Sequence, residues 1–106
     1  MADKKKTPTT RRDEQTMVKE RLKRPRKHKV VLHNDDFTPM EFVVEILESL
    51  FRRTSAEATR IMLSVHQSGI GIAGIYSGEI AEAKAVKTIR LARESGYPLL
   101  CTTEPE

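Results

Sequence analysis

The sequence has too little cysteine and too little continuous hydrophobic sequence for several classes of protein. Cys101 is the single cysteine, which rules out an internal disulfide and suits a reducing compartment. No apolar run approaches the length of a transmembrane helix, and no apolar segment of a secretory signal follows the basic N-terminus. A chain of 106 residues suffices for one domain. The composition therefore predicts a single-domain cytoplasmic protein with no membrane partner.

The sequence also lacks the patterns that hold metals, nucleotides and catalytic nucleophiles. Three His and one Cys are too few for paired zinc ligands, and the polar segment 34–36 lacks the spacing and the glycine of a calcium loop. The glycines within 69–78 match neither nucleotide-binding pattern. His66 has no credible partner, because Ser64 lies on another helix face. We therefore predict no catalytic residue, metal or cofactor, and a small enzyme is a weak alternative.

Charge is divided unevenly along the chain. Residues 1–26 hold ten Lys and Arg against four Asp and Glu, whereas residues 27–106 hold nine against eleven. The resulting net charges of +6 and −2 account for the total of +4. We expect residues 1–26 to be a disordered basic extension and residues 27–106 to be one folded domain. That domain has no basic excess, which argues against nucleic acid as a partner, but the extension keeps an RNA- or ribosome-associated protein as an alternative.

Hydrophobic periodicity alternates between strand and helix patterns after residue 26. The β-branched Val30 and Val31 mark a first strand, and Gly69 and Gly96 stop the second and third helices. The pattern predicts strands at 27–33, 71–76 and 99–103 and helices at 39–53, 54–67 and 79–94. The order β-α-α-β-α-β predicts an α/β fold of the α+β type, with the helices on one face of a three-stranded sheet.

Two of the helices begin with the sequence of a capping box. Thr38 is a good N-cap, with Pro39 in the first helical position and Glu41 three residues after the threonine. Thr54 and Glu57 repeat the same spacing before the second helix. We therefore expect both threonines to cap their helices.

The loop between the first strand and the first helix is a candidate binding site. Residues 34–36 supply an amide and two carboxylates where the strand meets the helix. These side chains either bond the local backbone, as Asn and Asp often do, or capture a cationic group such as an amine. Met40 follows the loop, and Met62 lies on the second helix. Methionine fills cores in most proteins, but it also lines pockets that accept varied apolar side chains.

The segment 27–104 closely resembles the ClpS family, the adaptors that deliver N-end-rule substrates to a Clp protease. The matching residues are Asn34-Asp35-Asp36, Thr38-Pro39-Met40-Glu41-Phe42-Val43, Ala58-Thr59, Ile61-Met62-Leu63, Val65-His66, Gly69, Pro98-Leu99 and Cys101-Thr102. The resemblance implies three antiparallel strands and three helices, similar to the C-terminal domain of the ribosomal stalk protein.

The resemblance also implies a function: binding proteins that begin with Phe, Tyr, Trp or Leu. The residues matching the family's α-amino-group site are Asn34, Asp35 and His66. The residues matching its side-chain pocket are Thr38, Met40, Val43, Met62, Val65 and Leu99. Met40 matches the residue that excludes side chains branched at Cβ. Because the amine needs an unprotonated imidazole nitrogen, we expect binding to weaken once His66 is protonated.

A second surface of the family docks the N-terminal domain of the unfoldase ClpA, and its matching residues here are Glu79 and Lys84.

The chain departs from the family pattern at three positions. Phe37 stands where the family usually has Tyr, Tyr97 where it often has His, and Ala83 where it usually has Thr. These departures bear on docking and on the preference among the four N-terminal residues, which the resemblance leaves open.

Overall fold

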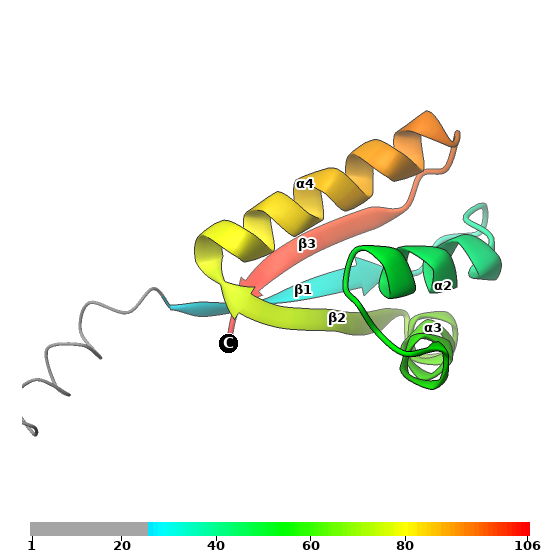
Figure 1. Ribbon diagram of the computed structural model, residues 1–106. Helices are drawn as coiled ribbons and strands as arrows, with labels where there is room; N and C mark the ends of the chain where they lie inside the picture. Colours follow the sequence, from blue (N-terminus) through cyan, green and yellow to red (C-terminus); the bar gives the residue numbers. More distant parts are fainter. Residues whose placement is uncertain (1–25) are drawn as a thin grey trace, which may run out of the picture.

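The computed structural model describes residues 26–106, which form three strands and three helices (Figure 1). In chain order these are β1 (Lys27–His33), α2 (Met40–Ser49), α3 (Ser55–Ser68), β2 (Ile70–Ser77), α4 (Gly78–Glu94) and β3 (Leu100–Pro105). The predicted order β-α-α-β-α-β is confirmed. The predicted disordered extension, residues 1–26, lies outside the described residues except for Arg26.

The strands form one antiparallel sheet in the order β2-β1-β3, so that β1 is central. Val30 and Leu32 on β1 belong to the hydrophobic core. Between them, Val31 points to the opposite face, because side chains alternate along a strand. The register with β2 shifts between Val30 and Val31. Since β1 is central, the loop that follows His33 leaves from the middle of one end of the sheet.

The helices cover the face of the sheet that carries Val30 and Leu32. Figure 1 shows α4 lying along the sheet, while α2 and α3 gather at the end where β1 finishes. The face of α4 toward the sheet carries small side chains, and Ala81 and Ala92 are fully buried, which lets the helix approach closely. Within residues 26–106, no helix is long and apolar enough to span a bilayer.

The predicted start and end of α3 are confirmed. The Thr54 hydroxyl accepts a hydrogen bond from the Glu57 amide at 3.2 Å. The Glu57 carboxylate in turn accepts one from the Thr54 amide at 2.9 Å, which completes the capping box. At the other end, Gly69 takes the left-handed conformation with φ 88°, as expected of a C-terminal cap.

The predicted capping box of α2 is wrong. The N-cap residue is Pro39, and no side chain caps the helix. The Thr38 hydroxyl instead donates a hydrogen bond to the Asp35 carboxylate at 2.7 Å. Glu41 is exposed in the first turn, with no partner on Thr38. Asp35 also accepts a hydrogen bond from the Thr38 backbone amide at 2.7 Å, which is the donor that Glu41 accepts in a capping box.

Helix α2 also ends earlier than predicted, at Ser49 rather than near Arg53. Arg52 takes a left-handed conformation with φ 52°, and the Arg53 amide returns to the Leu47 carbonyl at 3.0 Å. The chain thus leaves the helix through a left-handed residue that is arginine rather than the usual glycine, which explains why the sequence carried no stop signal. The other predicted bounds differ from the observed ones by at most two residues.

Candidate binding site

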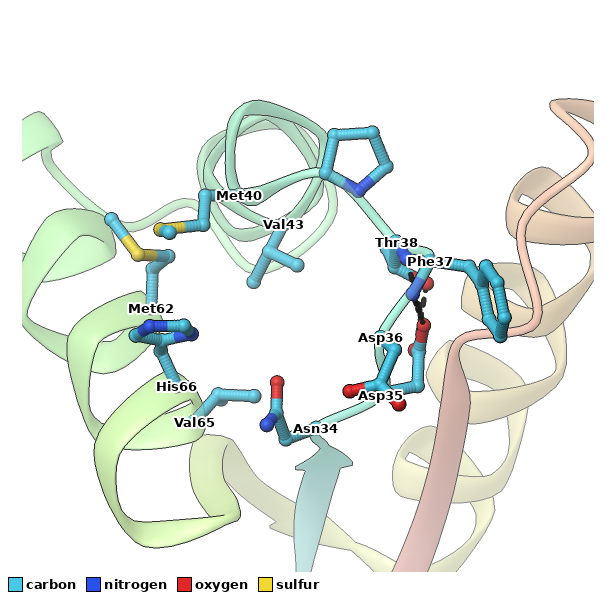
Figure 2. A pocket seen from close by; sticks show the side chains of 11 residues that line it. Asn34, Asp35, Asp36, Phe37, Thr38, Met40, Val43, Met62, Val65 and His66 are labelled. Atoms are coloured by element: carbon cyan, nitrogen blue, oxygen red, sulfur yellow. Dashed lines mark hydrogen bonds between the residues drawn. The ribbon is translucent and has the colours of Figure 1, made fainter.

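A cavity of about 350 Å³ opens where the β1–α2 loop faces α2 and α3 (Figure 2). One wall is largely polar and comes from the loop, and the opposite wall is largely apolar and comes from the two helices. The lining residues are Asn34, Asp35, Asp36, Phe37, Thr38, Pro39, Met40, Val43, Met62, Val65 and His66. The cavity therefore joins segments that lie far apart in the sequence.

Asp35 organises the polar wall. Its Oδ1 accepts hydrogen bonds from the Phe37 amide at 2.8 Å and from the Thr38 amide at 2.7 Å. Its Oδ2 accepts the Thr38 hydroxyl at 2.7 Å, and Figure 2 marks these bonds. A carboxylate offers about four acceptor positions, so one remains for a ligand. Both interpretations of the loop can thus hold together: Asp35 bonds the local backbone and can still accept from a cation.

The hydrogen bonds also keep Asp35 charged. Partial burial pushes the pKa of Asp35 upward, but the hydrogen bonds from Thr38 and Phe37, together with the Arg93 charge, outweigh burial and lower the pKa below its usual value. The polar wall therefore presents a negative charge to the cavity near neutral pH.

The end of α3 fixes the position of Asn34. The backbone amide of Asn34 donates a hydrogen bond to the Gly69 carbonyl at 2.9 Å. The Gly69 amide in turn donates to the Val65 carbonyl at 3.0 Å. The left-handed conformation of Gly69 lets the chain reverse at this point. The loop and the last turn of α3, which carries Val65 and His66, are therefore held against each other.

The apolar wall combines the first turns of α2 with one face of α3. Val43 and Val65 form its buried part, with 5% and 4% of their surfaces exposed, and Figure 2 shows both pointing into the cavity. Met40 is 44% exposed, and Met62 is half-buried. Met62, Val65 and His66 share a face because residues three and four apart lie together on a helix.

The structure brings together all three residues predicted for the amine, Asn34, Asp35 and His66. The predicted pocket residues that line the same cavity are Thr38, Met40, Val43, Met62 and Val65. Leu99 does not line it: the side chain is 1% exposed and lies in the core. Leu99 immediately precedes β3, and its carbonyl accepts a hydrogen bond from Arg93 at 2.8 Å.

Three lining residues had been assigned from the sequence neither to the amine site nor to the side-chain pocket: Asp36, Phe37 and Pro39. All three belong to the motif segment 34–43, so the signal was present in their neighbours. Phe37 is 76% exposed, and Figure 2 shows its ring pointing away from the centre of the cavity. The ring therefore borders the site rather than filling it.

Glu79 and Lys84 lie elsewhere, on a second hollow of about 460 Å³ between α4 and the end of α2. Glu79 is exposed in the first turn of α4. Lys84 is bound within the chain, since its Nζ donates to the Leu50 carbonyl at 2.7 Å. The same Nζ lies 5.7 Å and 5.1 Å from the ring centroids of Phe51 and Tyr76. Of the two predicted docking residues, Glu79 is thus the freer to meet a partner.

Metal ligation and thiol chemistry have little support in residues 26–106. No group of three or more His, Cys, Asp or Glu in this part of the chain could hold a metal ion. Cys101 is buried, and burial raises its pKa to about 11, so its reactive thiolate form is suppressed. The Ser64 hydroxyl donates to the Ile70 carbonyl at 3.0 Å, away from His66.

Comparisons with known proteins identify the family of the chain. Residues 23–102 match the family model of the ATP-dependent Clp protease adaptor protein ClpS. The Clp protease adapter protein ClpS of Lawsonia intracellularis is 53% identical over 83% of this chain and 81% of its own length. The corresponding protein of Nitratidesulfovibrio vulgaris is 52% identical over 88% and 93% of the two chains.

A solved structure gives the same result. Agrobacterium tumefaciens ClpS2 bound to L-phenylalaninamide has a TM-score of 0.75 and 42% identity, covering 78% of this chain and 100% of that one. Sequence and fold therefore agree on one assignment. The chain belongs to the ClpS family of ATP-dependent Clp protease adaptors, which are adaptor proteins and not enzymes.

Proposed function

We propose that this adaptor binds proteins by their first residue, Phe, Tyr, Trp or Leu, and delivers them to the Clp protease through the unfoldase ClpA. The observation that carries the proposal is the pairing, in one cavity, of a charged acceptor wall with an apolar wall. The ligand of the ClpS2 relative, L-phenylalaninamide, joins a free amino group to an apolar side chain and so has the same two features.

The polar wall suits an α-ammonium group, which offers three donors. The Asn34 side-chain oxygen, the remaining acceptor position on Asp35 and one imidazole nitrogen of His66 provide three acceptors. The ionised Asp35 adds charge attraction that a neutral acceptor would lack. An acetylated N-terminus loses both the charge and two of the donors, so it should bind much more weakly.

The apolar wall suits a side chain that is unbranched at Cβ. Burying Phe or Leu against Val43 and Val65 contributes about 1.5–3 kcal/mol, and each hydrogen bond to a charged group adds about 1.5–3 kcal/mol. After the cost of association, roughly 8 kcal/mol remains, which corresponds to micromolar affinity. Met40, at the start of α2, is the residue we assign to excluding Val and Ile.

Fluorescence anisotropy with labelled peptides tests this assignment. Peptides that begin with Phe or Leu should bind with micromolar affinity, while N-acetyl-Phe and Val peptides should bind at least about tenfold more weakly. The Met40→Ala variant should reduce the difference in affinity between peptides that begin with Val and peptides that begin with Leu. Equal binding of Phe and N-acetyl-Phe peptides would contradict amine capture.

Delivery depends, in this proposal, on the surface around Glu79 and on the basic extension of residues 1–26. A chain that starts at residue 27 should bind the Phe peptide as tightly as the full chain, yet fail to support degradation of a Phe-headed protein by the Clp protease. Full degradation of the protein with the shortened chain would show that delivery does not need the extension.

A further inference from the structure

The methionines of the folded part are all in one place. The chain has four methionines, Met1, Met17, Met40 and Met62. The two that fall within residues 26–106, Met40 and Met62, both line the candidate binding cavity. Figure 2 shows the two thioethers at the same side of the cavity, one from α2 and one from α3. Any chemical change at sulfur in these side chains therefore occurs on the binding wall.

The two methionine side chains are more exposed to small reagents than the cysteine is. Met40 is 44% exposed, and Cys101 is 3% exposed. The pKa of the Cys101 thiol is raised to about 11 by burial, so little thiolate is present to react with an oxidant. Met62 is half-buried along the same cavity. Within residues 26–106, the accessible sulfur is thus the thioether of the binding site.

We propose that Met40 and Met62 are an oxidant-sensitive modification site, at which peroxides form methionine sulfoxide and thereby weaken binding of apolar N-terminal residues. The inference rests on the proposed function and adds regulation of the same cavity. It makes capture of substrates dependent on the oxidation state of two side chains.

The reaction needs only the peroxide and the thioether. A lone pair of the sulfur attacks one oxygen of hydrogen peroxide, so that an S–O bond forms as the O–O bond breaks. The departing hydroxide takes the proton from the transferred oxygen and leaves as water. Sulfur is oxidised by two electrons and peroxide is reduced by two. Methionine sulfoxide reductases reverse the change, one enzyme for each sulfoxide epimer.

The sulfoxide changes the character of the apolar wall. Its oxygen is polar and needs a hydrogen-bond donor, and a ligand side chain packed against it would exclude water. Val43 and Val65, the buried part of the wall, offer no donor from their side chains. The nearby polar side chains, Asn34 and His66, are the ones assigned to the ligand's amino group. Oxidation therefore either buries an unpaired oxygen or competes for the amine-binding groups.

The test measures binding before and after oxidation of the full chain. Hydrogen peroxide is added until peptide mapping by mass spectrometry shows conversion of Met40 and Met62. The dissociation constant of the labelled Phe peptide should rise about tenfold or more, and methionine sulfoxide reductases A and B should restore it. Circular dichroism checks that the oxidised chain stays folded.

Leucine variants assign the effect to particular sulfurs. Each variant is compared with itself before and after oxidation, so its own starting affinity does not matter. Met17→Leu should lose affinity on oxidation as the original chain does, while the double variant Met40→Leu/Met62→Leu should show no change. Met62→Leu leaves Met40 as the only cavity methionine to oxidise, so that the effect of one cavity sulfoxide can be measured if double oxidation unfolds the domain.

Three results would overturn the inference. Met40 and Met62 could stay unoxidised when Met1 and Met17 are fully converted, or the affinity for the Phe peptide could be unchanged with both cavity sulfoxides present. The third is an equal loss of affinity on oxidation in the double variant. Failure of the proposed function looks different. In that case the unoxidised chain would fail to bind the Phe peptide, or would bind its N-acetyl form equally well.

Discussion

At the scale of single residues, the site depends most on Asp35. Its carboxylate accepts three hydrogen bonds from Phe37 and Thr38 and so sets the shape of the loop. The same bonds keep it ionised, which gives the cavity its negative wall. Loop geometry and ligand charge are thus supplied by one side chain, and a change there should affect both.

We expect Asp35→Asn to weaken binding of a Phe-headed peptide by about tenfold to a hundredfold, because a hydrogen bond to a charged group is worth about 1.5–3 kcal/mol. Asp36→Asn is the matched control: Asp36 lines the cavity and carries the same charge. It should change affinity less than threefold, roughly. Anisotropy titrations at one salt concentration measure both. Equal losses would mean that general negative charge, rather than Asp35 itself, binds the amine.

Stability should depend on the protonation of Asp35. Its pKa in the folded chain is lowered from 3.8, so the folded state binds this proton less readily than the unfolded state. The resulting stabilisation is fully present above the unfolded value and is lost as pH falls from there through the folded pKa. Urea midpoints between pH 6 and pH 3 should therefore fall more for the original chain than for Asp35→Asn. Parallel falls in the two chains would contradict this.

At the scale of elements, the last turn of α3 positions the loop. The Gly69 carbonyl accepts a hydrogen bond from the backbone amide of Asn34, and Gly69 has a left-handed conformation with φ 88°. A Cβ at Gly69 would meet no atom within 4 Å, so substitution costs backbone strain rather than a clash. Any change in stability or binding on replacing this glycine should therefore come from the backbone conformation alone.

We expect Gly69→Ala to lower the free energy of unfolding by about 1–2 kcal/mol and to weaken peptide binding through the shift of Asn34. Gly96→Ala is the control, because Gly96 has φ 81° with nothing within 4 Å of a Cβ and lies at the end of α4. It should lose similar stability with unchanged affinity. Urea unfolding and anisotropy separate the two, and loss of binding in both variants would contradict the positioning role.

The two capping-box sequences show how far the sequence predicts this fold. The Thr54 box forms with both partners, Thr54 and Glu57, within one turn. The Thr38 box has the same spacing but does not form, because Asp35 accepts the Thr38 backbone amide in place of Glu41 and the N-cap residue is Pro39. The left-handed Arg52 that helps to end α2 has no local signal at all. Local rules thus located every element but not every boundary.

The candidate site could be predicted to a similar extent. Residues 34–40 were identifiable because they are contiguous, and Met62 and His66 because the family motif places them. Leu99 is the one predicted pocket residue that lies in the core and not on the cavity surface, since the packing of the segment before β3 decides where its side chain lies. That orientation depends on tertiary packing, which a linear motif does not record.

At the scale of the whole molecule, the cavity and the second hollow are separate but share helix α2. The first turns of α2 carry Met40 and Val43, and its end contributes Ser49 and Leu50 to the hollow beside α4. An adaptor needs two surfaces that can be occupied at once. In the proposed function, cargo bound in the cavity would leave the hollow beside α4 open to the protease.

We expect Glu79→Ala to leave peptide affinity within about twofold, since Glu79 lies outside the cavity, and to slow degradation of a Phe-headed reporter by the Clp protease with ClpA several-fold. Arg90→Ala is the control, an exposed charge on the same helix outside both hollows. It should affect neither measurement. Degradation at the original rate with Glu79→Ala would show that Glu79 does not contribute to docking.

The measurement that tests the central claim most directly is a crystal structure of the chain with a peptide that begins with phenylalanine. The account predicts an ammonium nitrogen within hydrogen-bond distance of Asn34, Asp35 and His66, and a phenyl ring between Val43 and Val65. A peptide bound with its amino group in solvent, or seated in the hollow beside Glu79, would contradict it.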